Sequence, residues 1–282
     1  MSRKLLYIAD LDGTLLNSAK EVSECSQQVI NNHLARGGSF TIATARTLAT
    51  TERLVSALHI NIPVILMNGV AIYDLKKGVY DKVAAIPAAT AEAITEILEE
   101  SGIKGFMYSI ENNQLNTYYE DLNTPGLKTF HDNRVRKFNK FFQQVSQLKH
   151  QSRSQNVVYF TLIDEFEPLT RVGQALGNLP GINVLMYRDI YSDTLWYLEI
   201  YGQAASKRNA VVYLRERYGF DYVIGFGDNL NDLSLVEACD ECYAVANAVD
   251  ELKDQATGVI GDNNSHAVAR FIAQREELLL NR

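Results

Sequence analysis

The sequence predicts an α/β fold, with a three-layer core built around a parallel sheet and a second, inserted α+β domain. Two patterns support this prediction. At both ends of the chain, short apolar runs alternate with helical segments, which is typical of right-handed βαβ units. In the middle of the chain, strand-like runs come in pairs with helices between them. The chain has 282 residues, of which 46% are hydrophobic, and this length favours two domains.

The first part of the core is predicted over residues 1–82. The run LLYIA at residues 5–9 is apolar without alternation, as expected of a parallel strand that is buried on both faces. Two glycines at 37–38 mark the end of the first helical pattern. The elements expected in this part are strands over 5–9, 39–43 and 63–67 and helices over 23–36 and 47–58.

The inserted domain is predicted over residues 83–190. Asn112 and Asn113 separate two strand-like runs, as in a hairpin, and a helical pattern separates two further runs. Because these strands are paired instead of alternating singly with helices, they are expected to form a sheet of their own. The expected strands cover 105–110, 115–119, 157–164 and 182–187, with a helix over 166–178.

The parallel pattern is expected to return at residue 191 and to continue to residue 282. The run TLWYLEIY at 194–201 is assigned to the core for this reason. Residues 1–82 and 191–282 should therefore form one core domain that is interrupted by the insert. The other elements expected here are strands over 222–227 and 244–246 and helices over 207–218, from 231 and near 265–280.

The composition argues against several classes of protein. A net charge of -7 and a pI near 5.3 disfavour general binding to nucleic acid or to an anionic membrane. No apolar stretch approaches the length of about 20 residues that spans a bilayer, and the N-terminus lacks the pattern of a secretory signal. An odd count of three cysteines suits a reducing compartment. We therefore expect a cytoplasmic protein, with its oligomeric state left open.

Two local features allow alternative interpretations. Cys239 and Cys242 form a CxxC pair, which would suit redox or metal chemistry, but no second CxxC completes a structural zinc site. Two small residues at a helix end are the favoured interpretation. The stretch from Arg134 to Arg153 holds six basic residues and no acid. It is typical of a solvated helix face, and the alternative is an electropositive surface that attracts anionic substrates.

Two acidic loops are expected to meet at the carboxyl edge of the core sheet. DLDGT at 10–14 follows the first strand, and GDNLND at 227–232 follows a later one. Parallel strands end at the same edge, where open α/β sheets bind ligands. Mg²⁺ favours a few carboxylates together with water and substrate phosphate. The two loops therefore predict a pocket for a metal ion and a phosphate group.

Two donors between these loops fit the same pocket. Thr44 ends a predicted strand, and Lys207 begins a predicted helix. A hydroxyl and an ammonium group are suitable donors for phosphoryl oxygens. Each alone is more typical of a β-forming threonine or a solvated lysine, so the prediction depends on their occurring together with both acidic loops.

The set of motifs resembles the haloacid dehalogenase (HAD) superfamily of phosphatases, and within it the Cof-type hydrolases of subclass IIB. The resemblance covers nearly the whole chain and implies a Rossmann-like core with a C2B-type cap formed by the insert. The Asn-Gly turn at 68–69 and the segment Ala-Asn-Ala at 246–248 are similar to two further loops of this subfamily. The four family motifs match DLDGT at 10–14, AT at 43–44, SK at 206–207 and GDNLND at 227–232.

The resemblance implies a role for the first acidic loop. Asp10 would be the nucleophile that attacks phosphorus and forms an aspartyl-phosphate. Asp12 would protonate the leaving group and later deprotonate the hydrolytic water. Gly13 would allow the tight turn that brings both aspartates to one site.

The resemblance also implies which residues bind the ligands. Mg²⁺ would be held by the carboxylate of Asp10, the backbone carbonyl of Asp12 and Asp228, with Asn231 and Asp232 in support. The phosphoryl group would be bound by Thr44, Asn68 and Lys207. Two positions depart from the subfamily pattern, because Ala45 and Arg208 stand where glycine is usual. These departures concern the substrate pocket and leave the catalytic side chains in place.

The sequence therefore predicts a Mg²⁺-dependent phosphatase that hydrolyses small phosphorylated metabolites, with sugar phosphates as one candidate class. The insert would act as a cap that excludes water and supplies specificity. Two alternatives stay open. One is a phosphomutase or phosphotransferase that uses the same aspartyl-phosphate. The other is a catalytically silent sensor that binds a phosphorylated ligand, although such a sensor has no need for Asp12.

Overall fold

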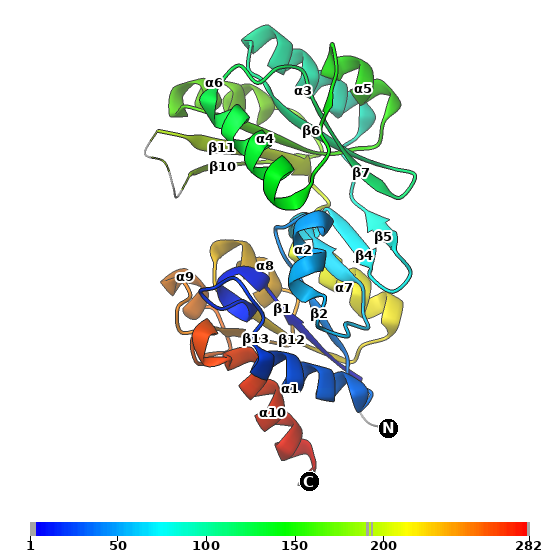
Figure 1. The fold of residues 1–282 in the computed structure, drawn as a ribbon, viewed down its shortest axis with the longest axis vertical. Coiled ribbons are helices and arrows are strands. Elements are labelled where there is room, and N and C mark those ends of the chain that lie inside the picture. The colour runs from blue at the N-terminus through cyan, green and yellow to red at the C-terminus, as the bar shows by residue number, and fades with distance from the viewer. Residues whose placement is uncertain (1–3, 190–191, 193, 281–282) are drawn as a thin grey trace. The chain divides into compact units, whose positions relative to one another are not determined.

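The computed structural model describes residues 4–189, 192 and 194–280, which form two compact units (Figure 1). One unit, which we call the core, comprises residues 1–82 and 206–282, and the other, which we call the cap, comprises residues 83–205. The chain returns from the cap to the core at residue 206, and not at residue 191 as the sequence predicts. The reason is that the segment at 194–201 belongs to the cap sheet. The predicted boundary between residues 190 and 191 lies outside the described residues.

The core contains a five-stranded parallel sheet with the strand order β14-β13-β12-β1-β2. β1 and β12 are neighbours, and Ala9 of β1 pairs with Phe226 of β12. The two strands therefore reach the same edge of the sheet in register. The strands are β1 (Leu5–Ala9), β2 (Phe40–Ile42), β12 (Tyr222–Gly227), β13 (Glu241–Ala244) and β14 (Gly258–Val259).

Helices cover both faces of this sheet, as predicted. Ile8 of β1 packs in one apolar cluster with residues of α7 and α8. Its neighbour Tyr7 points to the opposite face and contacts the ring of His33 in α1, beside which α10 lies (Figure 1). Among the described residues, no helix has the length and apolar character needed to cross a membrane. The helices are α1 (Glu24–Ala35), α2 (Leu48–Val55), α7 (Lys207–Tyr218), α8 (Leu233–Val236), α9 (Asp250–Lys253) and α10 (Ala267–Leu280).

The predicted strand over 63–67 does not extend the parallel sheet. It touches that sheet through one isolated parallel bridge between Ala43 and Ile65, and otherwise pairs antiparallel with β4. Asn68 and Gly69 have φ angles of 55° and 98°, so the chain reverses direction directly after the strand. The elements of this small sheet and its turn are β3 (Val64–Leu66), η2 (Met67–Gly69), β4 (Ala71–Asp74) and β5 (Val79–Val83).

The cap contains a six-stranded sheet with the order β10-β11-β9-β6-β7-β8. The predicted hairpin is present, with Asn112 and Asn113 at φ angles of 49° and 64°. The assignment of 194–201 to the core was wrong, because Trp196–Gly202 forms β11, antiparallel to β9 and β10. Its alternating burial is typical of a sheet with one apolar face. The strands are β6 (Gly105–Glu111), β7 (Gln114–Tyr119), β8 (Gln143–Gln144), β9 (Val157–Asp164), β10 (Ile182–Arg188) and β11.

The two faces of the cap sheet are covered differently. Met107, Phe160 and Leu198 point to one face and pack with residues of α3, α5 and α6. On the other face, Phe106 stacks on Phe130 of α4, with ring centroids 5.0 Å apart. The cap helices are α3 (Ala88–Ser101), α4 (Pro125–Phe138), α5 (Leu148–Ser154) and α6 (Phe166–Leu176).

The two cysteines of the CxxC pair pack against β12. A Cβ atom added to Gly225 would lie 2.8 Å from Cys239 Sγ and 3.2 Å from Cys242 Sγ. Burial raises the pKa of the Cys242 thiol to about 12 and that of Cys239 well above its ordinary value. Neutral thiols in such a setting argue against redox or metal chemistry. Cys239 follows the end of α8, as the favoured interpretation expects, but Cys242 lies in β13 and not at a helix end.

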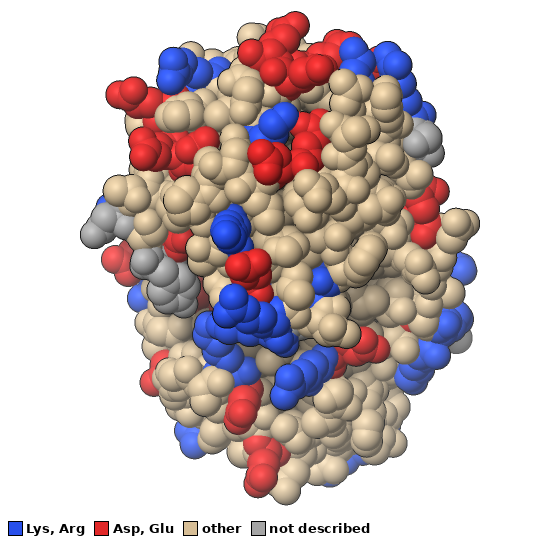
Figure 2. Space-filling view, turned by 45° about the horizontal axis from the view of Figure 1, so that its top comes forward, with Lys and Arg blue, Asp and Glu red and all other residues tan. Residues whose placement is uncertain are grey.

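Three of the six basic residues in the stretch from Arg134 to Arg153 form ion pairs with acidic residues of the cap. On the face drawn in Figure 2, Lys and Arg side chains lie in small groups, with Asp, Glu and neutral residues between them. Within the stretch, Arg134 and Lys140 differ, because each lies over an aromatic ring and forms no ion pair with a carboxylate of the described residues. The ion pairs join Arg136 to Asp132, Lys149 to Glu96 and Arg153 to Glu92.

Candidate active site

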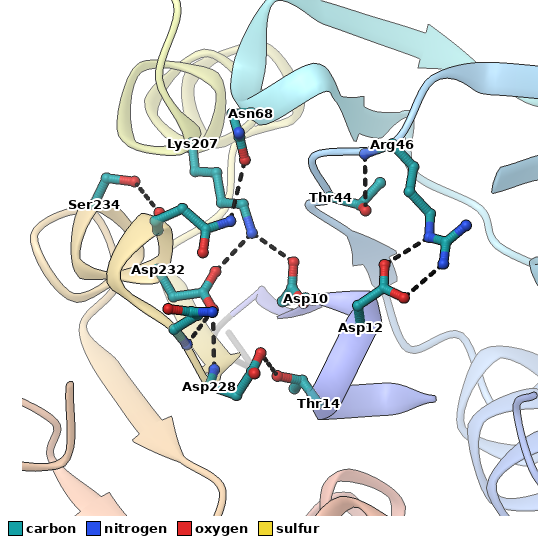
Figure 3. A network of polar contacts seen from close by, with 12 residues as sticks. Asp10, Asp12, Thr14, Thr44, Arg46, Asn68, Lys207, Asp228, Asp232 and Ser234 are labelled. Carbon is teal, nitrogen blue, oxygen red and sulfur yellow. Dashed lines mark hydrogen bonds and ion pairs between the residues drawn. The ribbon is translucent and has the colours of Figure 1, made fainter. Parts of the chain in front are cut away.

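The two acidic loops meet at the carboxyl edge of the core sheet, as their strand context predicts. The backbone N–H of Asp10 donates to the carbonyl oxygen of Phe226 at 2.9 Å, which ties the start of one loop to the end of the other strand. Asp10, Asp228 and Asp232 each place a carboxylate oxygen within 4.8 Å of the other two (Figure 3). More than two hundred residues separate the first loop from the second, so only the parallel sheet brings them together.

Position 13 requires glycine, because the second acidic loop lies too close to it for a side chain. Its φ angle is +78°, and a Cβ atom at this position would lie 2.3 Å from Asp228 Oδ2. Thr14, the next residue, donates a hydrogen bond from Oγ1 to Asp228 Oδ1 at 2.9 Å. The turn in DLDGT therefore leaves room for the Asp228 carboxylate and orients it.

Lys207 lies at the centre of the cluster. Its Nζ atom donates to Asp10 Oδ1 and to Asp232 Oδ1, at 2.6 Å each, and its side chain is fully buried (Figure 3). Asp232 also accepts hydrogen bonds from the backbone N–H groups of Asp228 and Asn229, at 2.9 and 3.1 Å. Asp232 therefore holds the lysine and the second acidic loop in fixed positions.

The start of α7, the helix that begins with Lys207, lies against the Asn68-Gly69 turn. Ser206 is the N-cap of α7, and its side chain accepts a hydrogen bond from the backbone N–H of Asn209. A Cβ atom on Gly69 would lie 2.1 Å from the carbonyl oxygen of Ser206, so only glycine permits this close approach. The Asn68-Gly69 turn thus packs directly against the start of the helix that carries the lysine.

The cluster holds more negative than positive charge. Burial raises the pKa of Asp10 well above its ordinary value, and the attraction of Lys207 offsets this only in part. Burial, with repulsion from Asp232, raises the pKa of Asp228 to about 6. Burial alone would lower the pKa of Lys207, but the attraction of Asp10 and Asp232 outweighs it and the pKa is raised. Three carboxylates around one ammonium group can accommodate a further cation.

Asp12 does not join this cluster. Its half-exposed carboxylate is turned toward Arg46, whose Nε and Nη2 atoms donate to its two oxygens at 2.6 Å each (Figure 3). The hydrogen bond to Asp12 raises the pKa of Arg46. The sequence analysis missed Arg46. Its signal was an arginine in the loop after the second strand, at the edge that carries both acidic loops.

Thr44, Asn68 and Asn231 lie in the loops around the cluster. Thr44 is buried, its Oγ1 accepts from the backbone N–H of Arg46 at 3.2 Å, and its carbonyl accepts from Asn68 N at 3.0 Å. The side chain of Asn231 donates to Asn68 Oδ1 at 3.2 Å. The turn at 68–69 is therefore linked to both the second strand loop and the second acidic loop.

Two other positions singled out in the sequence have clear contacts. Asn247, in the loop similar to the subfamily's late loop, donates from Nδ2 to the carbonyl oxygen of Gly13 at 2.8 Å. This contact supports the turn in DLDGT. Arg208 forms an ion pair with Glu237, with Nε and Oε2 3.5 Å apart.

Comparison with known proteins gives a consistent result. A family model described as haloacid dehalogenase-like hydrolase matches residues 7–272. The chain is 27% identical to the pyridoxal phosphate phosphatase YbhA of Escherichia coli (strain K12), over 93% of this chain and 95% of that protein. It is 26% identical to the 5-amino-6-(5-phospho-D-ribitylamino)uracil phosphatase YwtE of Bacillus subtilis (strain 168), over 94% of this chain and 96% of that protein.

Solved structures share the fold over nearly the whole chain. TM0651 from Thermotoga maritima superposes with a TM-score of 0.78 at 25% identity, covering 97% of each chain. The HAD subclass IIB sugar phosphatase BT4131 superposes with a TM-score of 0.71 at 17% identity, covering 97% of this chain and 99% of that one. At this low identity the second comparison concerns the fold alone.

The parallel core, the inserted cap and the acidic cluster define an α/β enzyme of the capped hydrolase class. The chain belongs to the haloacid dehalogenase-like hydrolase family. The family and the fold predicted from the motifs are thereby confirmed, as is the class of enzyme, a phosphatase. The roles assigned to single residues stay predictions.

Proposed function

We propose that this chain is a Mg²⁺-dependent phosphatase that hydrolyses small phosphorylated metabolites through an aspartyl-phosphate on Asp10. The observation that carries the proposal is the contact of Lys207 Nζ with Asp10 Oδ1 and Asp232 Oδ1, at 2.6 Å each. A buried ammonium group at the nucleophile can bind a phosphoryl oxygen as phosphorus approaches. The relatives named after pyridoxal phosphate and a phosphorylated ribitylaminouracil support a small metabolite as substrate.

The acidic cluster fits a hard divalent cation. Its oxygens come from Asp10, Asp228 and Asp232. Burial, with repulsion from Asp232, raises the pKa values of Asp10 and Asp228, and a bound cation would favour their ionised forms. We assign the Mg²⁺ ligands to Asp10, the backbone carbonyl of Asp12 and Asp228, with Asn231 and Asp232 in support. Bound Mg²⁺ would neutralise charge on the phosphoryl group and polarise its P–O bonds.

Two displacements at phosphorus would complete the reaction. In the first, a carboxylate oxygen of Asp10 bonds to phosphorus while the bond to the substrate oxygen breaks, and Asp12 gives its proton to that oxygen. In the second, Asp12 takes a proton from a water molecule, whose oxygen bonds to phosphorus while the bond to Asp10 breaks. Thr44, Asn68 and Lys207 would bind the phosphoryl oxygens during both steps.

The bond between Asp12 and Arg46 is incompatible with the first step. The guanidinium group of Arg46 donates a hydrogen bond to each of the two carboxylate oxygens of Asp12. A general acid needs a proton on one of these oxygens. The described contact therefore belongs to a resting arrangement, and Arg46 would release Asp12 when substrate binds.

The direct test is a phosphate-release screen over many phosphorylated metabolites, with Mg²⁺ and with EDTA, beside Asp10→Asn. We expect release with Mg²⁺, none with EDTA and none from the variant, because the amide is not a nucleophile. Asp254→Asn, an exposed aspartate of the core, is the matched control and should keep full activity. Full activity in Asp10→Asn would refute the aspartyl-phosphate. Phosphate recovered on a second organic hydroxyl instead of free in solution would indicate a phosphotransferase.

Two further variants test the roles of Asp12 and Arg46. Asp12→Asn should lower kcat on alkyl phosphates by about 10²–10⁴-fold, but much less on p-nitrophenyl phosphate, whose leaving group needs no proton. Arg46→Met should lower kcat on alkyl phosphates by no more than about tenfold, because the arginine leaves Asp12 before the proton moves. If Arg46→Met were as inactive as Asp12→Asn, a release of Asp12 would be contradicted.

A further inference from the structure

The face of the cap sheet opposite α3, α5 and α6 carries an unusual set of side chains. Because side chains alternate along strands, the residues next to the apolar ones at Met107, Phe160 and Leu198 point to this second face. Tyr159 stacks on Tyr201 with ring centroids 5.6 Å apart, and Tyr187 stacks on Tyr197 at 5.4 Å. We call this surface the tyrosine face and define it by Tyr108, Tyr159, Tyr187, Tyr197, Glu199 and Tyr201.

Glu199 lies in the middle of the tyrosine face. Its Oε2 accepts a hydrogen bond from the hydroxyl of Tyr159 at 2.6 Å, and its Oε1 accepts from the hydroxyl of Tyr187 at 2.9 Å. Burial raises the pKa of Glu199, although both tyrosines and Arg134 act in the opposite direction. Within the described part of the chain no Lys or Arg forms an ion pair with it. The carboxylate is thus held in place by neutral donors.

Two cations beside this face form no ion pair with a carboxylate of the residues that the structure describes. Arg134 Cζ is 3.3 Å from the ring centroid of Phe130, and Lys140 Nζ is 4.5 Å from Tyr108 and 5.0 Å from Phe142. The backbone N–H of Lys140 donates to the carbonyl of Arg134, so the two residues are held together. Neither takes part in an ion pair among residues 4–189, 192 and 194–280, in contrast to Arg136, Lys149 and Arg153.

Without a bound ligand, burial makes the charged forms of Arg134 and Lys140 unfavourable. Burial, together with the nearby charge of Arg134, lowers the pKa of Lys140 to about 7. The groups that face Lys140 are the rings of Tyr108 and Phe142 and the guanidinium of Arg134, and burial raises the pKa of Tyr108 to about 12, so it stays neutral. Contacts with ring faces compensate only a part of the loss of hydration. A bound anion would supply the missing counter-charge.

We propose that Arg134 and Lys140, with the Glu199–tyrosine cluster beside them, form an oxyanion-binding site of the cap. The two cations would bind a carboxylate or phosphate group, and Glu199 would accept a hydrogen bond from a hydroxyl or amino group of the same ligand. Tyr108 and Tyr159 are buried, but Tyr187 is exposed, and its stack with Tyr197 provides a flat apolar surface for the carbon skeleton of the ligand. The ligand class is therefore a small organic molecule that carries an oxyanion and a hydrogen-bond donor.

The oxyanion has two chemical sources. It is either a second anionic group of the phosphorylated substrate, in which case the inference rests on the proposed function, or a separate anionic effector. Kinetics and direct binding distinguish the two. Five proteins are compared, namely the unchanged chain, Arg134→Met, Lys140→Met, Lys140→Arg and Lys137→Met. The last is the matched control, because Lys137 is an exposed lysine of α4, the helix that carries Arg134.

The kinetic arm uses pairs of substrates that differ in one anionic group, such as 3-phosphoglycerate with glycerol 3-phosphate, and fructose 1,6-bisphosphate with fructose 6-phosphate. If the oxyanion belongs to the substrate, Arg134→Met and Lys140→Met should raise KM for the doubly anionic member by about tenfold or more. They should leave kcat and the KM of the singly anionic member unchanged. Lys140→Arg should keep most of the affinity, and Lys137→Met should behave as the unchanged chain.

The binding arm needs no turnover, so it is independent of the proposed function. The protein is labelled with ¹⁵N and ¹³C in lysine, the Lys140 signal is identified through Lys140→Met, and inorganic sulfate or 3-phosphoglycerate is added. We expect the Lys140 signal to shift and its pKa to rise, and we expect Arg134→Met to weaken the effect. A shift without any change in KM would assign the site to a separate effector. The proposal would be overturned if neither anion shifted the Lys140 signal and no variant changed KM selectively. Arg134 and Lys140 would then serve only in contacts with aromatic rings.

Discussion

The core and the cap each enclose a group of charged side chains, but they satisfy these charges in different ways. In the core, Lys207 binds two carboxylates directly, at 2.6 Å each. In the cap, Glu199 is held by two tyrosine hydroxyls, and Arg134 and Lys140 lie against aromatic rings. The core cluster is therefore joined into one network by the protein itself. The cap cluster keeps its opposite charges apart, which leaves its cations available to a ligand.

Removing the central lysine should break the core network with the largest effect. Lys207→Met leaves Asp10 and Asp232 buried without their cation, and breaking a buried pair in this way costs about 3–5 kcal/mol. We expect the free energy of unfolding, measured by urea titration, to fall by about this amount and phosphatase activity to be lost. Added Mg²⁺ should restore part of the stability, because a cation would again lie among the carboxylates.

Arg208→Met is the control for this prediction. Arg208 follows Lys207 in the same helix, and its ion pair with Glu237 is exposed. Exposed pairs contribute about 0–1 kcal/mol, so this variant should change stability little. A Lys207→Met protein as stable as Arg208→Met would show that the core network does not depend on its lysine.

The core network was largely predictable from the sequence, because each of its members follows or begins a regular element. Asp10 and Asp228 come after strands that the apolar runs identify, and a parallel sheet brings their ends together. The pairing of Asp12 with Arg46 was not predictable in this way. Both residues lie in loops of the same edge, and only the three-dimensional path of each loop determines which charged groups meet.

The tyrosine face was missed for a different reason. The strand at 194–201 reads as apolar, and its three aromatic residues hid the period of two that places Glu199 opposite Leu198 and Ile200. Helical patterns at both ends of the chain gave no information on which sheet this strand would join. Pairing with β9 and β10 is a contact between distant segments, which a single run of residues does not specify.

The turn in DLDGT offers a sharper test of how the core positions its carboxylates. Its expected effect on stability is smaller than that of removing Lys207. Gly13→Ala combines a strained φ angle of +78° with a Cβ atom 2.3 Å from Asp228 Oδ2. We expect Asp228 to be displaced, and activity at low Mg²⁺ concentration to fall more than activity at saturating Mg²⁺. Gly37→Ala is the matched control, because its φ angle is +87° and nothing lies within 4 Å of the added atom. Both variants should lose about 1 kcal/mol of stability from backbone strain, but only Gly13→Ala should alter the Mg²⁺ dependence.

The contrast between the core and the cap can also be tested through the dependence of cap stability on pH. Lys140 has its pKa lowered to about 7 in the folded protein, by burial and by Arg134, from an ordinary value of 10.5. Between these values the unfolded chain binds more protons than the folded one, so the free energy of unfolding should rise as the pH is raised from 7 toward 10. Urea titrations at several pH values should show this increment in the unchanged chain and in Lys137→Met. Lys140→Met should lack it, and sulfate should reduce it by raising the pKa of Lys140. An increment of equal size in Lys140→Met would mean that Lys140 does not cause it and that the charge of this lysine is already balanced by other groups of the cap. The contrast with the core would then disappear.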